Sequence, residues 1–201
     1  MRVKKFTTEK GYTIIETMIA ISLFIVIVMA GTNAVLNANL LSQKGRDMRS
    51  ILDNLSFVME DMSRNIRTGY NYRCYFNVNG TIDPASVNIP RSCPSGWGIA
   101  LESQNGNTAL LTDQWIYYIG TYNGQNGIFK STDGSASFIK LTPDEVVVDA
   151  VSSISVLGAE ATPGNKQQPF VTIKIVGTIT SKNVITPFSL QTSASQRLVD
   201  I

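Results

Sequence analysis

Histidine is absent from this sequence, and its absence restricts the possible chemistry more than any residue that is present. None of the 201 residues is a histidine, and only Cys74 and Cys93 are cysteines. A chain without histidine has no Ser-His-Asp or Cys-His nucleophile system, no imidazole base and almost none of the usual catalytic zinc sites. The composition therefore predicts a protein that is not an enzyme, with no metal and no other cofactor.

Two short stretches resemble reactive sites in residue type alone, without the structural context that such sites need. Ser137 and Lys140 have the Ser-x-x-Lys spacing, but on a predicted strand their side chains would face opposite sides. Asp144, Glu145 and Asp149 lack the Asp-x-Asp-x-Asp-Gly loop of a calcium site, so we interpret them as a solvated acidic run.

Glu16 is the charged residue whose position most requires an explanation, because it lies in the apolar part of the N-terminal segment. An uncharged run of 27 residues, Thr17 to Gln43, follows it. As a helix, this run would be about 40 Å long at ~1.5 Å per residue, and about 20 residues suffice to cross a bilayer. A carboxylate in such a segment is costly and by default has a function or a partner.

The basic residues are concentrated at the N-terminus. The first ten residues hold four of the 17 lysines and arginines, whereas from Lys44 onward 13 basic and 13 acidic residues balance one another. The neutral body lacks the basic surface of a nucleic-acid-binding protein, so no nucleic acid is predicted as a partner.

The N-terminal segment has three interpretations. A secretory leader would end at a small-x-small site, for which Met29-Ala30-Gly31 and Asn37-Ala38-Asn39 are weak candidates. A plain signal anchor explains the apolar run and the flanking bases, but not Glu16. In the third, the string Gly11-Tyr12-Thr13-Ile14-Ile15-Glu16, after a basic leader and before an apolar helix, resembles the cleavage and methylation signature of type IV prepilins and pseudopilins. Tyr12 stands where phenylalanine or methionine is usual in that family.

The resemblance implies a processing route and a domain organisation. A prepilin peptidase would remove the leader, residues 1–11, by cutting after Gly11, and would N-methylate Tyr12. Residues 12–38 would be the transmembrane half of a helix that later forms the filament core. Residues 39–69 would be its amphipathic half, and residues 70–201 a β-rich pilin-like globular domain.

The resemblance also implies a location and partners. The chain would be a single-pass protein of the cytoplasmic (inner) membrane, with its C-terminal domain extracytoplasmic, before it enters a pilus or pseudopilus filament. Its partners would be the prepilin peptidase, other pilin or pseudopilin subunits, an inner-membrane assembly platform and, before assembly, membrane lipid.

After cleavage, Glu16 would lie one helical turn from the new amine of Tyr12. Its carboxylate would pair with that amine or with the amine of an adjacent subunit, which would set the axial step between subunits. The alternative is a carboxylate that only reaches toward the lipid headgroups.

The helical pattern continues beyond the membrane-length run as an amphipathic helix. Apolar residues recur at spacings of three and four on one face, and charged residues occupy the other, where Asp61 and Arg64 have the spacing of an ion pair. No proline interrupts Thr13 to Thr68, and Gly69 is the predicted stop. Gly31-Thr32-Asn33 is the weak point, either as the membrane boundary or, as the resemblance implies, as a segment that unwinds on assembly. The apolar stripe consists of Met48, Ile51, Leu52, Leu55, Val58, Met59, Met62 and Ile66.

After Gly69 the pattern changes to strands and turns. On the strand Trp115–Tyr122, alternation places Trp115 and Tyr117 on one face and Tyr118 and Tyr122 on the other, which favours core and surface packing over a stacking surface. The predicted strands are 97–101, 109–112, 115–122, 128–131, 137–141, 154–157, 170–180 and 187–195, and the predicted turns are Asn105-Gly106, Asn123-Gly124, Asn126-Gly127, Asp133-Gly134 and Pro163-Gly164.

These elements predict an α+β fold in which the long N-terminal helix packs on a C-terminal antiparallel sheet, and this is also the pilin architecture. The last stretch, residues 187–197, resembles the C-terminal strand of minor pilin-like proteins of the J or W type. A pilin domain faces an oxidising compartment, which favours a Cys74–Cys93 disulfide worth about 3 kcal/mol over two free buried thiols.

The sequence thus predicts a pilin-like structural subunit, of minor type, in a type IV pilus or a type II secretion-type pseudopilus. The alternative is a membrane-anchored extracytoplasmic domain that binds a ligand or acts as an adhesin.

Overall fold

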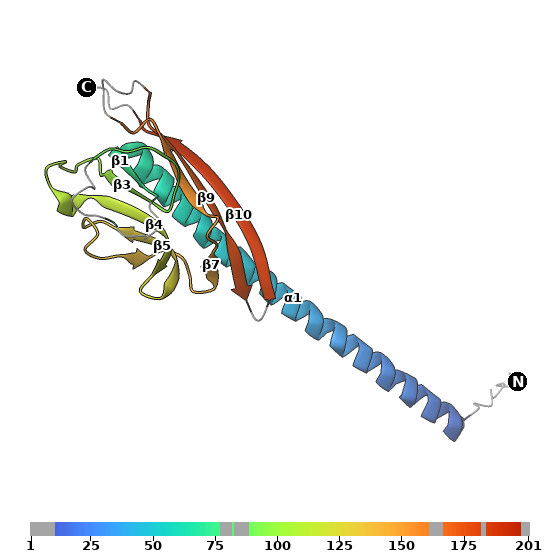
Figure 1. Cartoon of the computed structure of the whole chain (residues 1–201). Coiled ribbons are helices and arrows are strands. Elements are labelled where there is room, and N and C mark those ends of the chain that lie inside the picture. Colours follow the sequence, from blue (N-terminus) through green and yellow to red (C-terminus); the bar gives the residue numbers. More distant parts are fainter. Residues whose placement is uncertain (1–10, 77–81, 83–88, 161–166, 182–183, 198–201) are drawn as a thin grey trace, which may run out of the picture. The chain divides into compact units, whose positions relative to one another are not determined.

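The computed structural model of this chain describes residues 11–76, 82, 89–160, 167–181 and 184–197 (Figure 1). The first ten residues of the expected leader and the expected turn at Pro163-Gly164 lie outside the described residues. The chain divides into two compact units, Met1–Arg46 and Asp47–Ile201.

A single helix, α1 (Ile14–Thr68), accounts for all the helical structure that the sequence predicts. It continues through the weak point at Gly31, where the Thr32 hydroxyl donates a hydrogen bond of 2.8 Å to the carbonyl of Val28. It ends one residue before Gly69, whose N–H donates to the carbonyl of Asn65 at 2.8 Å.

Gly69 follows α1 because the chain passes close to strand β3 (Gly98–Glu102) at that point. A Cβ atom at position 69 would lie 2.7 Å from the carbonyl oxygen of Glu102 and 2.9 Å from that of Asn65. Both are backbone atoms that a side chain cannot displace cheaply. The helix stop is therefore a packing requirement as well as a local signal.

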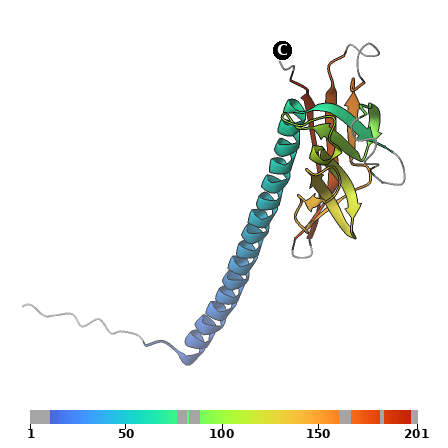
Figure 2. The same cartoon turned by 90° about the vertical axis from the view of Figure 1, so that its left-hand side faces the viewer.

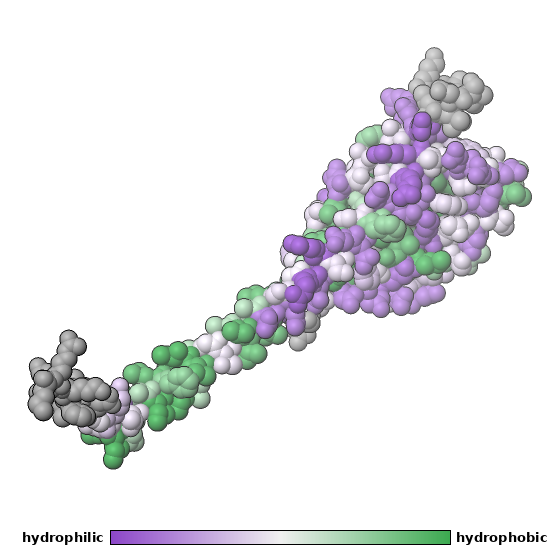
Figure 3. Space-filling model, turned by 180° about the vertical axis from the view of Figure 1, so that it is seen from behind, coloured by the Kyte–Doolittle hydropathy of each residue, from purple (hydrophilic) through white to green (hydrophobic). Residues whose placement is uncertain are grey.

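The part of α1 in the first unit has an apolar surface. Figure 3 shows hydrophobic side chains dominating this part of the helix, and Phe24, for example, is 66% exposed. By length and composition, α1 is able to cross a membrane, and it is the one such helix among the described residues. An apolar helix surface of this length is typical of a segment that lies in lipid or against other helices.

The part of α1 in the second unit lies along the sheets (Figure 2), and its apolar stripe belongs to the core that it shares with them. Leu55, Met62 and Ile66 have no exposed surface, and Met48 and Leu52 pack at the edge of the core. The stripe predicted from the spacing of three and four is therefore confirmed, and the fold is α+β as expected. The buried members of the apolar stripe are Ile51, Leu55, Val58, Met59, Met62 and Ile66.

The β structure forms two antiparallel sheets that share one core with α1. The first sheet has the order β1-β3-β4-β5-β6, and the second has the order β10-β9-β8-β2 with β7 also pairing β9. The strands are β1 (Tyr70–Tyr75), β2 (Cys93–Gly96), β3 (Gly98–Glu102), β4 (Trp115–Tyr122), β5 (Gln125–Ser131), β6 (Ile139–Lys140), β7 (Val146–Val148), β8 (Ser153–Leu157), β9 (Phe170–Ser181) and β10 (Val184–Ser195).

Alternation along β9 shows how the sheet meets the core. Val171, Ile173 and Ile175 are buried, whereas Thr172 and Lys174 between them are half-buried and exposed, which is the alternation of a half-buried strand. β10 pairs with β9 along its whole length and has no strand on its other side among the described residues, so it is an edge strand of the sheet as described.

Two local predictions are wrong. The predicted strand 109–112 is a loop that leads into a short 3-10 turn, η2 (Leu111–Asp113). The predicted turn at Asn126-Gly127 lies inside β5, where Asn126 pairs with Thr121, and the chain reverses at Asn123-Gly124. Asn123 and Gly124 both have positive φ, which suits a two-residue hairpin, so the first of two similar dipeptides makes the turn.

Candidate functional site

The predicted processing junction lies directly before α1. Gly11 and Tyr12 precede the helix, and the Tyr12 side chain is 83% exposed. A Cβ atom at Gly11 would meet nothing within 4 Å. The junction is therefore an accessible peptide without regular secondary structure next to a helix end, and substitutions at Gly11 have no packing cost.

Glu16 lies in the first turn of α1. Thr13 is the residue before the helix, and its hydroxyl oxygen accepts a hydrogen bond of 3.3 Å from the N–H of Glu16. Thr13 and Glu16 thus have the spacing of a capping box, and a carboxylate in this turn also interacts favourably with the helix dipole. The helix start gives Glu16 a local role that the sequence analysis did not consider.

Cys74 and Cys93 form a disulfide, as expected. Cys74 belongs to β1 of the first sheet and Cys93 to β2 of the second, so the bond joins the two sheets covalently. Both side chains are buried. A Cβ atom at Gly96 would lie 2.5 Å from the sulfur of Cys74, so a glycine is required beside the bond.

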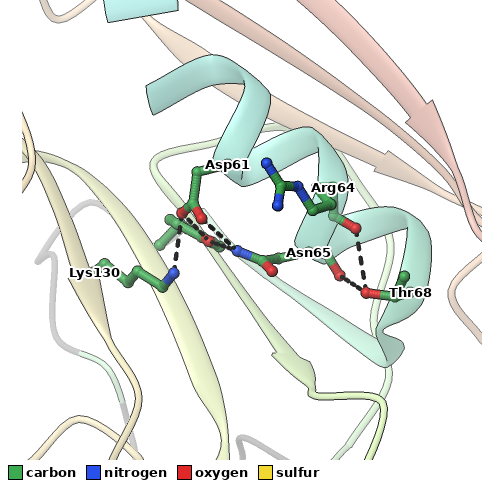
Figure 4. A network of polar contacts seen from close by, with 6 residues as sticks. Asp61, Arg64, Asn65, Thr68 and Lys130 are labelled. Atoms are coloured by element: carbon green, nitrogen blue, oxygen red, sulfur yellow. Dashed lines mark hydrogen bonds and ion pairs between the residues drawn. The ribbon is translucent and has the colours of Figure 1, made fainter. Parts of the chain in front are cut away.

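A polar network connects the second half of α1 to the first sheet (Figure 4). Asp61 accepts hydrogen bonds from the Tyr117 hydroxyl at 2.8 Å, from the Asn65 amide at 3.0 Å and from the Lys130 ammonium at 3.0 Å. The Lys130 ammonium also lies 4.5 Å from the ring centroid of Trp115. The expected ion pair of Asp61 with Arg64 is wrong, because Lys130, 69 positions away, takes the carboxylate instead.

The network changes the acidity of its members. Burial raises the pKa of Asp61, but hydrogen bonds from Lys130 and Tyr117 and the charge of Lys130 outweigh burial and leave that pKa below its ordinary value. Burial and the nearby Asp61 carboxylate raise the pKa of Tyr117 far above its ordinary value. Asp61 is therefore the charged acceptor and Tyr117 a permanent donor at neutral pH.

A groove of about 1090 Å³ lies between the second half of α1 and β10. Every residue from Leu190 to Arg197 lines it, which is typical of a strand edge and not of a sheet face, where alternate residues would point away. Arg64, Arg67 and Arg197 also line the groove, and none of the three has an ion pair among the described residues.

Ser137 lies before β6 and not on the predicted strand, and Ser137, Lys140 and Asp144 contact other side chains. The Ser137 hydroxyl donates to Asp133 at 2.5 Å, and Lys140 pairs with Asp144 at 2.6 Å. Three hydrogen bonds from Ser131 and Ser137 lower the pKa of Asp133 to about 2. These contacts stabilise the turn at Gly134.

The aromatic residues of β4 lie on two opposite faces of the strand, as predicted. Tyr117 is fully buried in the core, and Trp115 packs against it. On the opposite face Tyr118 contacts Trp97, Phe129 and Phe138 in edge-on and stacked arrangements. The rings on this face pack on one another.

The described residues contain no group of three or more Cys, Asp or Glu side chains placed to hold a metal ion. The chain matches no family model, no curated protein and no solved structure. These comparisons therefore indicate no function for this chain.

Sequence patterns alone did not indicate the Asp61 network, the edge position of β10 in the described sheet or the linkage of two sheets by the disulfide. Each of these features depends on residues that are far apart in the chain. The opposite charges of Asp61 and Lys130 are the one sign of them in the sequence.

Proposed function

We propose that this chain is a pilin-like structural subunit of a type IV pilus or a type II secretion-type pseudopilus. One observation supports the proposal most: an accessible Gly11-Tyr12 junction lies directly before a continuous apolar helix whose first turn contains Glu16. A peptidase cut after Gly11 would leave the charged amine of Tyr12 one turn from that carboxylate.

The arrangement suits assembly and not catalysis. The exposed apolar surface of the first unit would lie in lipid before assembly and against the helices of other subunits afterwards. The second unit, with its disulfide and its shared core, would decorate the filament on the extracytoplasmic side. Prepilin peptidase, other pilin subunits and the inner-membrane assembly platform are the partners that this function requires.

Intact-mass analysis of the chain after co-expression with a prepilin peptidase tests the proposal. We expect loss of residues 1–11 and a gain of one methyl group on Tyr12. Gly11→Val should block the cut, and because nothing lies within 4 Å of that position, the variant should fold normally. A mature N-terminus near Asn39, or no cut in the unmodified chain, would contradict the proposal.

The groove beside β10 favours a second function, a membrane-anchored binding domain. Its free strand edge offers unpaired backbone groups, and Arg64, Arg67 and Arg197 supply positive charge. Both features fit an extended acidic segment of a partner protein that adds to β10 as a further strand.

Fluorescence anisotropy with an acidic, extended probe peptide tests this second function. Arg64→Gln with Arg67→Gln should weaken binding several-fold, as expected for partly exposed charge pairs, and added salt should do the same. Arg49→Gln, an exposed arginine outside the groove, is the matched control. Equal affinity for all three proteins would contradict a role of the groove.

A further inference from the structure

The loop between β3 and β4 encloses three oxygen atoms that lack hydrogen-bond donors. They are Oε2 of Glu102, Oδ1 of Asp113 and Oε1 of Gln114, and all three are buried without a donor among the described residues. The side chains of Glu102 and Gln114 have no exposed surface at all. Most buried polar groups in native proteins are hydrogen-bonded, so three unsatisfied acceptors around one loop require an explanation.

The three side chains that carry these oxygens are linked by a hydrogen bond and by charge. The Gln114 amide donates to Oε1 of Glu102 at 2.7 Å, which holds the two side chains together. Asp113 is adjacent in sequence, and its other oxygen accepts the N–H of Asn107 at 2.9 Å. Burial raises the pKa of the Glu102 carboxyl; the hydrogen bond from Gln114 opposes this effect, and the negative charge of Asp113 adds to it, so the pKa lies above its ordinary value.

The turn at Gly106 packs against the carboxylate of Glu102. A Cβ atom at Gly106 would collide with Oε2 of Glu102 and would lie 3.2 Å from the carbonyl oxygen of Ser103. The Tyr70 hydroxyl donates to the Gly106 carbonyl at 2.7 Å and so fixes the turn. The backbone of the turn therefore passes close to the unpaired carboxylate oxygen of Glu102.

In the part of the chain that the structure describes, no ion pair neutralises Glu102 or Asp113. The ion pairs among the described residues are Asp61–Lys130 and Asp144–Lys140, and neither involves Glu102 or Asp113. The cluster thus combines two carboxylates and one amide, all offering only oxygen acceptors. Hard divalent cations select this set of donors.

We propose that Glu102, Asp113 and Gln114 bind a calcium ion. Two carboxylates balance the charge of Ca²⁺, and the amide oxygen of Gln114 supplies a neutral ligand. Ca²⁺ takes six to eight oxygens in irregular geometry, so main-chain carbonyls of the turn and water complete the shell. Mg²⁺ fits less well because it requires a near-ideal octahedron. With three side-chain ligands, we expect a dissociation constant of about 10⁻⁴–10⁻³ M, as in extracellular calcium modules.

The test uses the full chain in an uncharged detergent, freed of metal with a chelator. Thermal unfolding followed by circular dichroism should show a melting temperature that rises saturably with CaCl₂, less with MgCl₂ at equal ionic strength, and falls again on chelation. Glu102→Gln should remove the calcium response and leave the metal-free protein at least as stable, because an amide replaces a buried charge. Asp113→Asn provides the same readout if Glu102→Gln does not fold.

Asp53→Asn is the matched control, since Asp53 is an exposed acid on α1 far along the chain from the loop, and it should keep the full response. An unchanged melting temperature with calcium in the unmodified chain would overturn the proposal. So would an equal response in Glu102→Gln or Asp113→Asn. A metal-free protein that becomes more stable on mild acidification, with no calcium response, would assign the cluster to a proton shared by Glu102 and Asp113 instead.

Discussion

The hydroxyl oxygen of Thr13 accepts a hydrogen bond of 3.3 Å from the backbone N–H of Glu16. This contact starts α1 one residue after Thr13 and places Glu16 in the first helical turn. Two roles of Glu16 can therefore be separated by mutation. One is local, at the helix start, and the other is the proposed pairing with the amine of Tyr12 in the same or an adjacent subunit.

Glu16→Val should leave the second unit folded, the helix inserted and cleavage after Gly11 largely intact, because Glu16 has no contact outside the first turn among the described residues. Incorporation into filaments, or crosslinking to partner pilins, should fall strongly, since a buried amine would lose its partner. Glu16→Asp, shorter by one methylene, should lie between.

Thr13→Ala is the control for the local role. It removes the cap, at a cost of about 1 kcal/mol to the helix, but keeps the carboxylate. Assembly should then be reduced much less than by Glu16→Val. Equal losses in the two variants would show that the helix start matters and the charge pair does not.

Removing the acceptor of the Asp61 network should destabilise the second unit. Asp61→Ala leaves the buried Tyr117 hydroxyl and the Lys130 ammonium without their common partner, so we expect a loss of about 1–3 kcal/mol in the free energy of unfolding. Chemical denaturation measures this loss. Asp53→Ala, at an exposed position of the same helix, should change stability by less than about 0.5 kcal/mol.

The same network predicts a loss of stability in acid. The folded pKa of Asp61 is lower than its ordinary value of 3.8. The unfolded chain therefore binds a proton more readily, and the stabilisation is complete above that value and disappears as the pH falls through the folded pKa. Asp61→Asn should flatten the decrease in melting temperature below about pH 4. An acid profile identical to that of the unmodified chain would contradict this assignment.

Reduction of the Cys74–Cys93 disulfide should lower the stability of the second unit by about 3 kcal/mol, because the loop between the cysteines regains its freedom in the unfolded chain. Differential scanning calorimetry with and without reductant measures the change. A Cys74→Ala, Cys93→Ala double variant should melt at the lower temperature and should not respond to reductant. Any response of the double variant would mean that reductant acts elsewhere.

Two glycines next to or within α1 should respond in opposite directions to alanine. At Gly69 the new methyl group would press on the carbonyl oxygens of Glu102 and Asn65, so we expect a loss of about 1–3 kcal/mol. At Gly45 nothing lies within 4 Å, and alanine should strengthen the helix by up to ~1 kcal/mol. Thermal unfolding of both variants tests the pair, and a neutral Gly69→Ala would contradict the close approach of β3.

Periodic patterns determined much of this fold from the sequence alone. The apolar run, the amphipathic stripe through Leu55 and Met62, and the alternation along β4 and β9 were all predictable, because a helix or strand repeats its environment every few residues. The helix boundary at Gly69 was equally readable. These signals are local, and the structure confirms them.

Short elements and long-range contacts depended on the tertiary structure. β1, β2 and β7 were not predicted, since three to six residues carry too little periodicity and pair only when a partner strand is in place. Residues 109–112 have strand-forming side chains, yet the Asn107 side chain bonds the N–H of Ala109 at 3.0 Å and the chain turns.

The contacts that distinguish the candidate sites are set by chain folding in three dimensions. Asp61 had a charge partner three residues away, but Tyr117 and Lys130 converge on it from the sheet because α1 packs there. Glu102 and Gln114 meet only because β3 and β4 pair and the loop between them folds back. Local sequence determines which element forms, whereas side chains distant in the chain become neighbours only after hydrophobic burial has fixed the packing of those elements.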